Sequence, residues 1–202
     1  MDVEAAARAG WQPLDLVRAF LAGGARFLQL RAKHLSGSAF LDLASAAVVL
    51  AHAGQAQLIV NDRADIARLA GADGVHVGQE DLAPASVRAI VGDAAIVGLS
   101  THTIEQVEQA VRAPVTYIAV GPVFGTTTKA TGYECVGLER VREAARLAGV
   151  RGLPLVAIGG ITLENAASVL EAGAASVAVI GDLLSTGDPE GRVRAYRDRL
   201  WR

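Results

Sequence analysis

The feature that most constrains the fold of this chain is a regular alternation between two kinds of apolar segment. Seven short apolar runs, rich in β-branched residues, lie at residues 27–30, 58–60, 74–77, 96–99, 117–120, 155–158 and 176–180. Such runs are typical of strands buried on both faces of a parallel sheet. Between them lie segments with the period of amphipathic helices, at residues 13–22, 39–53, 64–70, 84–91, 104–111, 138–148, 163–172 and 189–200.

This alternation continues through all 202 residues and predicts one α/β domain built from right-handed βαβ units. We expect a TIM-type (β/α)8 barrel over residues 1–202 whose first strand is missing or truncated, because a barrel has eight strands and seven are predicted. Met1 and Asp2 would be the stub of that strand, and the natural chain is expected to begin further upstream. An open doubly wound sheet is the alternative, disfavoured because no GxGxxG follows the first predicted strand.

Composition narrows the class of protein. A hydrophobic content of 51% with 20% charged residues is typical of a globular protein with a sizeable core. The net charge of -2 gives no reason to expect a nucleic-acid or membrane partner, and no apolar stretch approaches the ~20 residues of a membrane span. The single cysteine, Cys135, and an N-terminus without the pattern of a secretory signal predict a cytoplasmic protein. Nothing in the sequence indicates an oligomeric state.

Polar or glycine residues follow every predicted strand at its carboxyl end, which is the active face of β/α-barrel enzymes. After the first strand, Gln29, Arg31 and Lys33 alternate with apolar residues and therefore share one face, directed into the barrel or its mouth. The later strands are followed by Asn61, Asp62, Gln79, Glu80, Asp81, Ser100, Thr126, Thr127, Thr128, Lys129, Gly159, Gly160, Ile180 and Gly181. We expect these residues to form one site.

The chemistry of these residues points to phosphate and a divalent cation. Of 19 basic residues only Lys33 and Lys129 are lysines, and both belong to this set. Asp62 and Asp81 are carboxylates from neighbouring strands, and a pair of carboxylates completed by phosphates and water is a usual way to hold Mg²⁺. Glycines after the last two strands suit a second phosphate, which they would bind through backbone N–H groups.

Each of these features has a simpler interpretation. Asp62 and Asp81 would otherwise be simple ion-pair partners of Arg31, Arg63 or Lys33, which is the less favoured interpretation. A glycine pair after a strand is commonly just a tight turn. His76 is interpreted as a core residue or as support for the site rather than as a catalyst.

Five motifs occur together, in this order: QLRAK at 29–33, VNDRADIARLAGADGVHVGQEDL at 60–82, GLSTH at 98–102, GPVFGTTTK at 121–129 and AIGGIT at 157–162. With them the chain resembles the thiamine-phosphate synthase family from about Ala25 onward. The resemblance implies a β/α barrel that joins a hydroxymethylpyrimidine diphosphate to a thiazole phosphate, with or without its carboxylate. The products would be thiamine phosphate and pyrophosphate, with Mg²⁺ as the cofactor.

The resemblance also implies a role for each matching residue. Gln29, Arg31, Lys33, Asn61, Ser100 and Lys129 would bind the pyrimidine diphosphate, and four of them, Arg31, Lys33, Ser100 and Lys129, would be catalytic. Asp62 and Asp81 would ligate Mg²⁺. Thr126, Thr127, Thr128, Gly160, Ile180 and Gly181 would bind the thiazole phosphate. Gly181 departs from the family, which usually has serine there, so one hydroxyl is lost.

The implied reaction is dissociative, with pyrophosphate leaving before the thiazole nitrogen attacks. Mg²⁺ and the cations Arg31, Lys33 and Lys129 would neutralise the leaving group, and Lys129 lies in a glycine-flanked segment that is expected to close over it. The alternatives are a thiazole tautomerase on the same barrel and a non-catalytic phosphate-binding protein. The complete diphosphate set argues against the tautomerase. An isomerase or aldolase lacks support, because no strand carries a suitable glutamate base or Schiff-base lysine.

Overall fold

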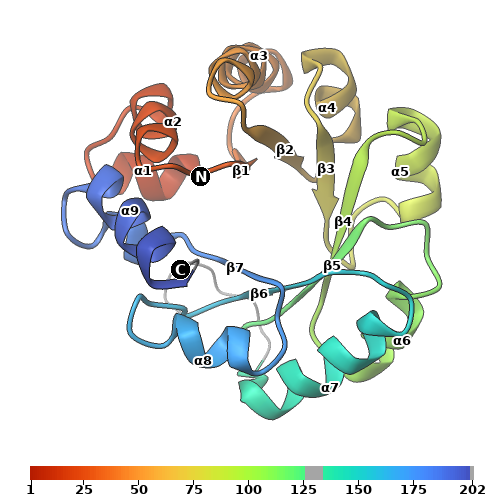
Figure 1. The fold of residues 1–202 in the computed structure, drawn as a ribbon. Coiled ribbons are helices and arrows are strands. Elements are labelled where there is room, and N and C mark those ends of the chain that lie inside the picture. Colours follow the sequence, from red (N-terminus) through yellow and green to blue (C-terminus); the bar gives the residue numbers. More distant parts are fainter. Residues whose placement is uncertain (126–133, 201–202) are drawn as a thin grey trace.

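The computed structural model describes residues 1–125 and 134–200, in which seven parallel strands follow one another in chain order around a ring (Figure 1). The strands are β1 (Phe27–Leu30), β2 (Gln57–Asn61), β3 (Gly74–Val77), β4 (Ile96–Thr101), β5 (Tyr117–Val120), β6 (Leu155–Ile158) and β7 (Ser176–Ala178). Each pairs with the next, so the predicted parallel sheet is confirmed.

Helices cover the outside of the ring (Figure 1). They are α1 (Val3–Arg8), α2 (Pro13–Ala22), α3 (Gly37–Ala53), α4 (Ala64–Ala70), α5 (Pro84–Val91), α6 (Ile104–Ala110), α7 (Gly137–Gly149), α8 (Ala166–Glu171) and α9 (Pro189–Leu200), with a 3₁₀ helix η1 (Gly181–Leu184). In the part of the chain that the structure describes, none of these helices is long and apolar enough to cross a bilayer.

Two helices were not expected from the sequence, and some element boundaries differ from the sequence prediction. α1 and η1 were not among the expected helices, because each is only one or two turns long and shows little periodicity. α8 begins at Ala166 rather than at residue 163, because the Asn165 side chain accepts a hydrogen bond from Thr162 N at 2.8 Å and holds the preceding residues in a turn. β7 ends at Ala178, and Ile180 already caps η1.

The first two residues lie beside β1 but do not make a strand. Arg31 N donates to Met1 O at 2.9 Å and Val3 N donates to Arg31 O at 3.0 Å, so Asp2 and Arg31 form an isolated parallel bridge. The sheet thus keeps β1 and β7 as its two ends among the described residues. A closed eight-stranded barrel is therefore not what these residues form, although Met1 and Asp2 occupy the position expected of a strand stub.

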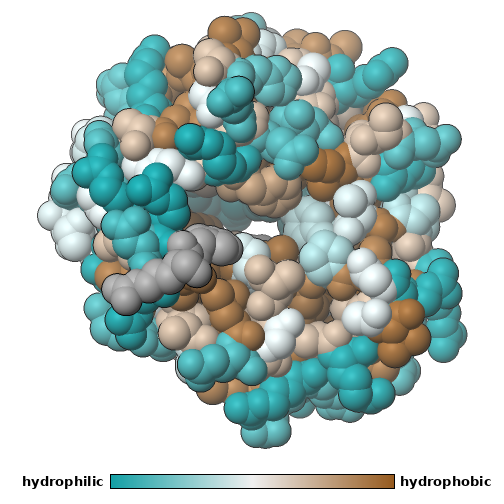
Figure 2. Space-filling model, in the orientation of Figure 1, coloured by the Kyte–Doolittle hydropathy of each residue, from teal (hydrophilic) through white to brown (hydrophobic). Residues whose placement is uncertain are grey.

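Two layers of side chains arise from the alternation along each strand. Leu28 and Leu30 of β1 are 4% and 0% exposed and belong to the apolar core, while Gln29 lies on the opposite, inward face. Complete burial of a Leu or Val side chain contributes about 1.5–3 kcal/mol, so the outward-facing aliphatic layer is a large source of stability. Polar side chains are left on the inward face, and Figure 2 shows a hollow at the centre of the ring.

Candidate active site at the carboxyl ends of the strands

An acidic pair lies at the carboxyl ends of β2 and β3. Asp62 follows β2 directly, with a left-handed backbone (φ +65) that is fixed by a 2.7 Å hydrogen bond from its N–H to His76 O. Asp81 accepts a hydrogen bond from Gly78 N at 2.8 Å. Burial raises the pKa of Asp62; the Lys33 ammonium opposes this rise and the neighbouring Asp81 carboxylate adds to it. The two carboxylates are therefore close enough to repel one another.

Lys33 is the counter-ion of this pair. Its Nζ contacts Asp62 Oδ2, which is the ion pair that the simpler interpretation of the sequence predicted. The Lys33 side chain is 42% exposed and that of Asp62 is 16% exposed, so the ammonium lies at the mouth of the site and the carboxylate lies within it. A half-exposed lysine exchanges partners at little cost, because such pairs contribute about 0–1 kcal/mol.

A cavity of about 230 Å³ opens at this pair, and its lining combines apolar and charged side chains. The lining residues are Ala32, Lys33, Leu35, Phe40, Asn61, Asp62, Arg63 and Asp81. Among residues 1–125 and 134–200, His, Cys, Asp and Glu nowhere come together in a group of three or more that would hold a metal ion. A cation at the acidic pair would thus have two protein carboxylates and take its other ligands from substrate and water, which fits Mg²⁺.

Arg31 forms its ion pairs with other residues than Lys33 does. Its Nη1 donates to Asp2 at 2.6 Å and to Glu4 at 3.2 Å, so one nitrogen holds both carboxylates of the N-terminal segment. The guanidinium has other N–H groups, and the side chain remains 21% exposed. Arg31 thus lies two residues before Lys33 in the sequence, but the structure pairs it with Asp2 and Glu4, which the sequence analysis did not connect with it.

A polar layer crosses the inside of the ring. His76 of β3, Gly98 of β4 and Tyr117 of β5 are register partners in adjacent strands. His76 Nδ1 lies 2.8 Å from Tyr117 Oη, and His76 Nε2 lies 2.7 Å from Ser100 Oγ. His76 is 6% exposed, which agrees with its interpretation as a core or supporting residue.

Gly98 is what allows His76 and Tyr117 to meet. A Cβ at this position would lie 2.1 Å from Tyr117 Cζ and 2.4 Å from His76 Nδ1, so no other residue fits between the two rings. Burial raises the pKa of the Tyr117 hydroxyl well above its ordinary value, against the smaller effect of a hydrogen bond from Gln29. Tyr117 is therefore a neutral hydroxyl linked to both Gln29 and His76.

The glycines after β6 lie at the same end of the sheet and form a tight turn. Gly159 and Gly160 have φ values of +100 and +64, and a Cβ on Gly160 would lie 2.5 Å from Gly125 O. Asn165 Nδ2 donates to Gly160 O at 3.1 Å and holds this turn in place. Ile180 and Gly181 follow β7 at the same end of the sheet. Thr126, Thr127, Thr128 and Lys129 lie outside the described residues.

Comparison with known proteins identifies the family of the chain. A model described as thiamine monophosphate synthase matches residues 4–183. The chain belongs to this family. The thiamine-phosphate synthase of Roseiflexus castenholzii is 46% identical over 185 residues, covering 92% of this chain and 80% of that protein. That of Thermus thermophilus is 44% identical over 197 residues, covering 96% and 93%.

Solved structures extend the family relationship to the fold. A thiamine phosphate pyrophosphorylase from Pyrococcus furiosus superposes with a TM-score of 0.84 at 29% identity, over 93% of this chain and 88% of that one. A 3-hexulose-6-phosphate synthase reaches a TM-score of 0.67 at 20% identity, over 99% and 95%, and shows only the shared fold. The resemblance read from the sequence motifs is thus confirmed.

The sequence analysis did not predict several polar residues that lie close to these turns and strands. The sequence analysis treats Tyr117 only as part of an apolar strand. A buried tyrosine hydroxyl usually has a hydrogen-bond partner, so a tyrosine in such a strand indicates a polar contact inside the ring. Asp182, Arg192 and Tyr196 form a network behind the glycine turns, and no local pattern connects them because 10 or more residues separate Asp182 from its partners.

Proposed function

We propose that this chain is a Mg²⁺-dependent transferase of the cytoplasm. It would couple 4-amino-2-methyl-5-(diphosphooxymethyl)pyrimidine with a thiazole phosphate or its carboxylated form. The products are thiamine phosphate and pyrophosphate. The observation that carries this proposal is the acidic pair Asp62–Asp81 with Lys33 at one cavity, in a chain of the thiamine monophosphate synthase family.

The acidic pair supplies the binding site for the cation. Mg²⁺ bound there supplies positive charge that stabilises the departing diphosphate. Burial and the neighbouring Asp81 carboxylate raise the pKa of Asp62, so a divalent cation at this pair would stabilise its ionised form. Lys33, whose ammonium pairs with Asp62 at the mouth of the site, would donate hydrogen bonds to the diphosphate.

Ser100 would act on the pyrimidine substrate as a hydrogen-bond donor. The neutral Tyr117 hydroxyl receives a hydrogen bond from Gln29 and donates its own proton to His76 Nδ1. His76 then carries its proton on Nε2 and donates it to Ser100 Oγ. With this tautomer of His76, the Ser100 hydroxyl proton would be free to point at the substrate.

The leaving group departs without a nucleophilic side chain in this mechanism. The charge that develops on pyrophosphate is stabilised by Lys33 and, through its remaining N–H groups, Arg31. The thiazole nitrogen attacks the resulting pyrimidine cation. The glycine turns after β6 and β7 would hold the thiazole phosphate, so that the protein contributes mainly by positioning two substrates.

The test is pyrophosphate release by the purified chain with both substrates, with and without Mg²⁺. We expect release that requires Mg²⁺ and the thiazole phosphate. Lys33→Ala should raise the KM for the pyrimidine diphosphate at least tenfold, about 1.4 kcal/mol of binding free energy, whereas Arg18→Ala, which removes an exposed pair with Asp15, should change nothing. Thiazole isomerisation without pyrophosphate release would indicate the tautomerase, and binding without turnover would indicate a non-catalytic protein.

A further inference from the structure

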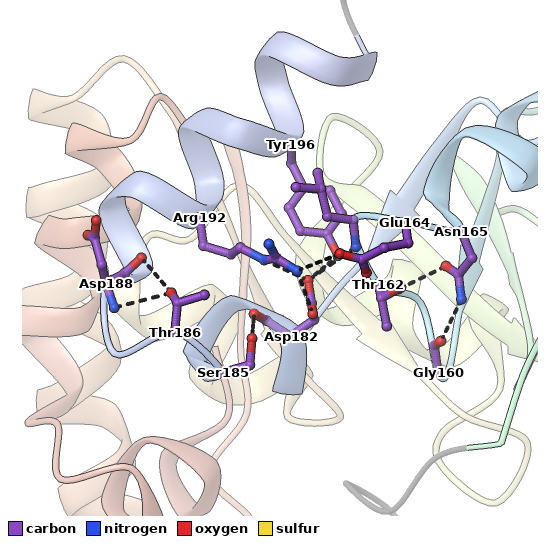
Figure 3. A network of polar contacts seen from close by, with 11 residues as sticks. Gly160, Thr162, Glu164, Asn165, Asp182, Ser185, Thr186, Asp188, Arg192 and Tyr196 are labelled. Atoms are coloured by element: carbon purple, nitrogen blue, oxygen red, sulfur yellow. Dashed lines mark hydrogen bonds and ion pairs between the residues drawn. The ribbon is translucent and has the colours of Figure 1, made fainter.

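A partly buried ionic network lies behind the two glycine turns, and Asp182 is its centre (Figure 3). The Asp182 carboxylate accepts hydrogen bonds from Arg192 Nε at 3.0 Å and Nη2 at 2.9 Å, and from Tyr196 Oη at 2.6 Å. It also accepts one from Leu163 N at 3.2 Å. Four donors on one carboxylate leave it fully satisfied without water.

The network joins three segments of the chain that are separate in sequence. Asp182 lies in η1, which follows β7; Leu163 lies in the connection after β6; Arg192 and Tyr196 lie in α9. Arg192 also approaches Glu164 Oε1 of the β6 connection at 3.6 Å. The turns after β6 and β7 are therefore held to each other and to α9 through one carboxylate (Figure 3).

The side chains of the network are shielded from solvent, so its hydrogen bonds contribute to holding the segments together. The side chains of Asp182 and Arg192 are 11% and 16% exposed, and Tyr196 is 5% exposed. Burial alone would raise the pKa of Asp182, but Arg192 and Tyr196 hold it below its ordinary value. Bidentate, charge-assisted hydrogen bonds of this kind fix geometry more strongly than neutral ones.

The segments that the network holds are those assigned to the thiazole phosphate under the proposed function. Gly181, which precedes Asp182, has no side chain and offers only its backbone N–H to an anion. Gly160 is likewise limited to its backbone, and Asn165 anchors its carbonyl group. These two turns would bind an anion through backbone groups, so their contribution to affinity depends on their relative position, and Asp182 joins the segments that carry them.

We propose that Asp182 is a positioning residue for the thiazole-phosphate half of the site and that Arg192 and Tyr196 act through it. This inference rests on the proposed function. The arrangement also explains how a carboxylate is tolerated next to a phosphate: Arg192 neutralises it. Loss of Arg192 should accordingly weaken phosphate binding more than loss of the Asp182 charge, and removing both should be milder than removing Arg192 alone.

Steady-state kinetics with each substrate varied in turn test this inference. Asp182→Asn should raise the KM for the thiazole phosphate about tenfold, close to 1.4 kcal/mol, and leave the KM for the pyrimidine diphosphate within about twofold. Arg192→Gln should raise the thiazole KM further, and the double variant should fall between the two. Tyr196→Phe, which removes a single hydrogen bond, should give a rise of about threefold and keeps the test available if Asp182→Asn fails to fold.

Asp73→Asn is the matched control. Asp73 also joins separate segments, since it accepts hydrogen bonds from Leu58 N at 2.7 Å and pairs with His52 at 3.1 Å, but it lies before β3, at the opposite end of the sheet. It should lower the thermal midpoint without changing either KM. Equal changes in both KM values for Asp182→Asn, or a loss of stability with no change in KM, would show a purely structural role.

Calorimetric titration with the thiazole phosphate separates this inference from the proposed function. If the wild type binds the compound but does not release pyrophosphate, the proposed function fails, and weaker binding by Asp182→Asn still supports the positioning role. Unchanged binding by Asp182→Asn, or no binding by the wild type, overturns it.

Discussion

Replacement of Gly98 by alanine tests whether the His76–Tyr117 layer is built as the structure shows. The added Cβ would lie 2.1 Å from Tyr117 Cζ and 2.4 Å from both Tyr117 Oη and His76 Nδ1. Carbon atoms prefer separations of about 3.5–4.0 Å, so both rings must move by more than 1 Å. The backbone offers no relief, because Gly98 is paired with β3 on one side and β5 on the other.

Two costs add in this variant. Overpacking a tightly filled interior costs about 1–3 kcal/mol. Separation of the rings also breaks the 2.8 Å hydrogen bond between His76 Nδ1 and Tyr117 Oη, and buried polar groups left unpaired cost about 1–3 kcal/mol more. We therefore expect the free energy of unfolding to fall by about 2–6 kcal/mol, which lowers the thermal midpoint by about 5–20 °C in a chain of this size.

Urea unfolding followed by circular dichroism measures this change, with Gly149→Ala as the control. Gly149 is the last residue of α7, and a Cβ there would have nothing within 4 Å. Alanine should leave stability unchanged or raise it by up to about 1 kcal/mol. Turnover should fall in Gly98→Ala, because Ser100 loses the orientation that His76 gives it, and stay normal in the control. A Gly98→Ala protein within about 1 kcal/mol of the wild type in stability would refute this account of the layer.

Three further predictions concern single polar side chains. Asp62→Asn should raise the thermal midpoint at neutral pH, because a carboxylate whose pKa is raised on folding destabilises the folded state when it is ionised. Asparagine also tolerates the left-handed backbone at this position. Mg²⁺ should stabilise the wild type in the same melts but not this variant, and an equal effect on both would contradict the acidic site. The lowered pKa of Asp182 adds stability above its unfolded value of 3.8, so the difference in midpoint between the wild type and Asp182→Asn should shrink as melts are taken below about pH 4. Asn165→Ala should weaken thiazole-phosphate binding in calorimetry, because Gly160 loses its anchor, and unchanged affinity would exclude that role.

The local pattern of the sequence determined the helices and strands and the end of the sheet at which the polar residues lie. Apolar runs such as residues 117–120 predicted strands, and several helices, among them Pro13–Ala22, begin and end as expected. These predictions succeed because periodicity and turn residues act over a few positions. The face shared by Gln29, Arg31 and Lys33 is likewise a consequence of the two-residue repeat of a strand.

The tertiary structure alone decided which polar groups meet. Strand register aligns His76, Gly98 and Tyr117 across three strands, and no spacing along the chain encodes that alignment. Arg31 pairs with Asp2 and Asp182 pairs with Arg192 because folded segments that are distant in sequence come together there. A buried charge takes the partner that packing brings within hydrogen-bond distance, and packing is a property of the whole fold rather than of any one segment.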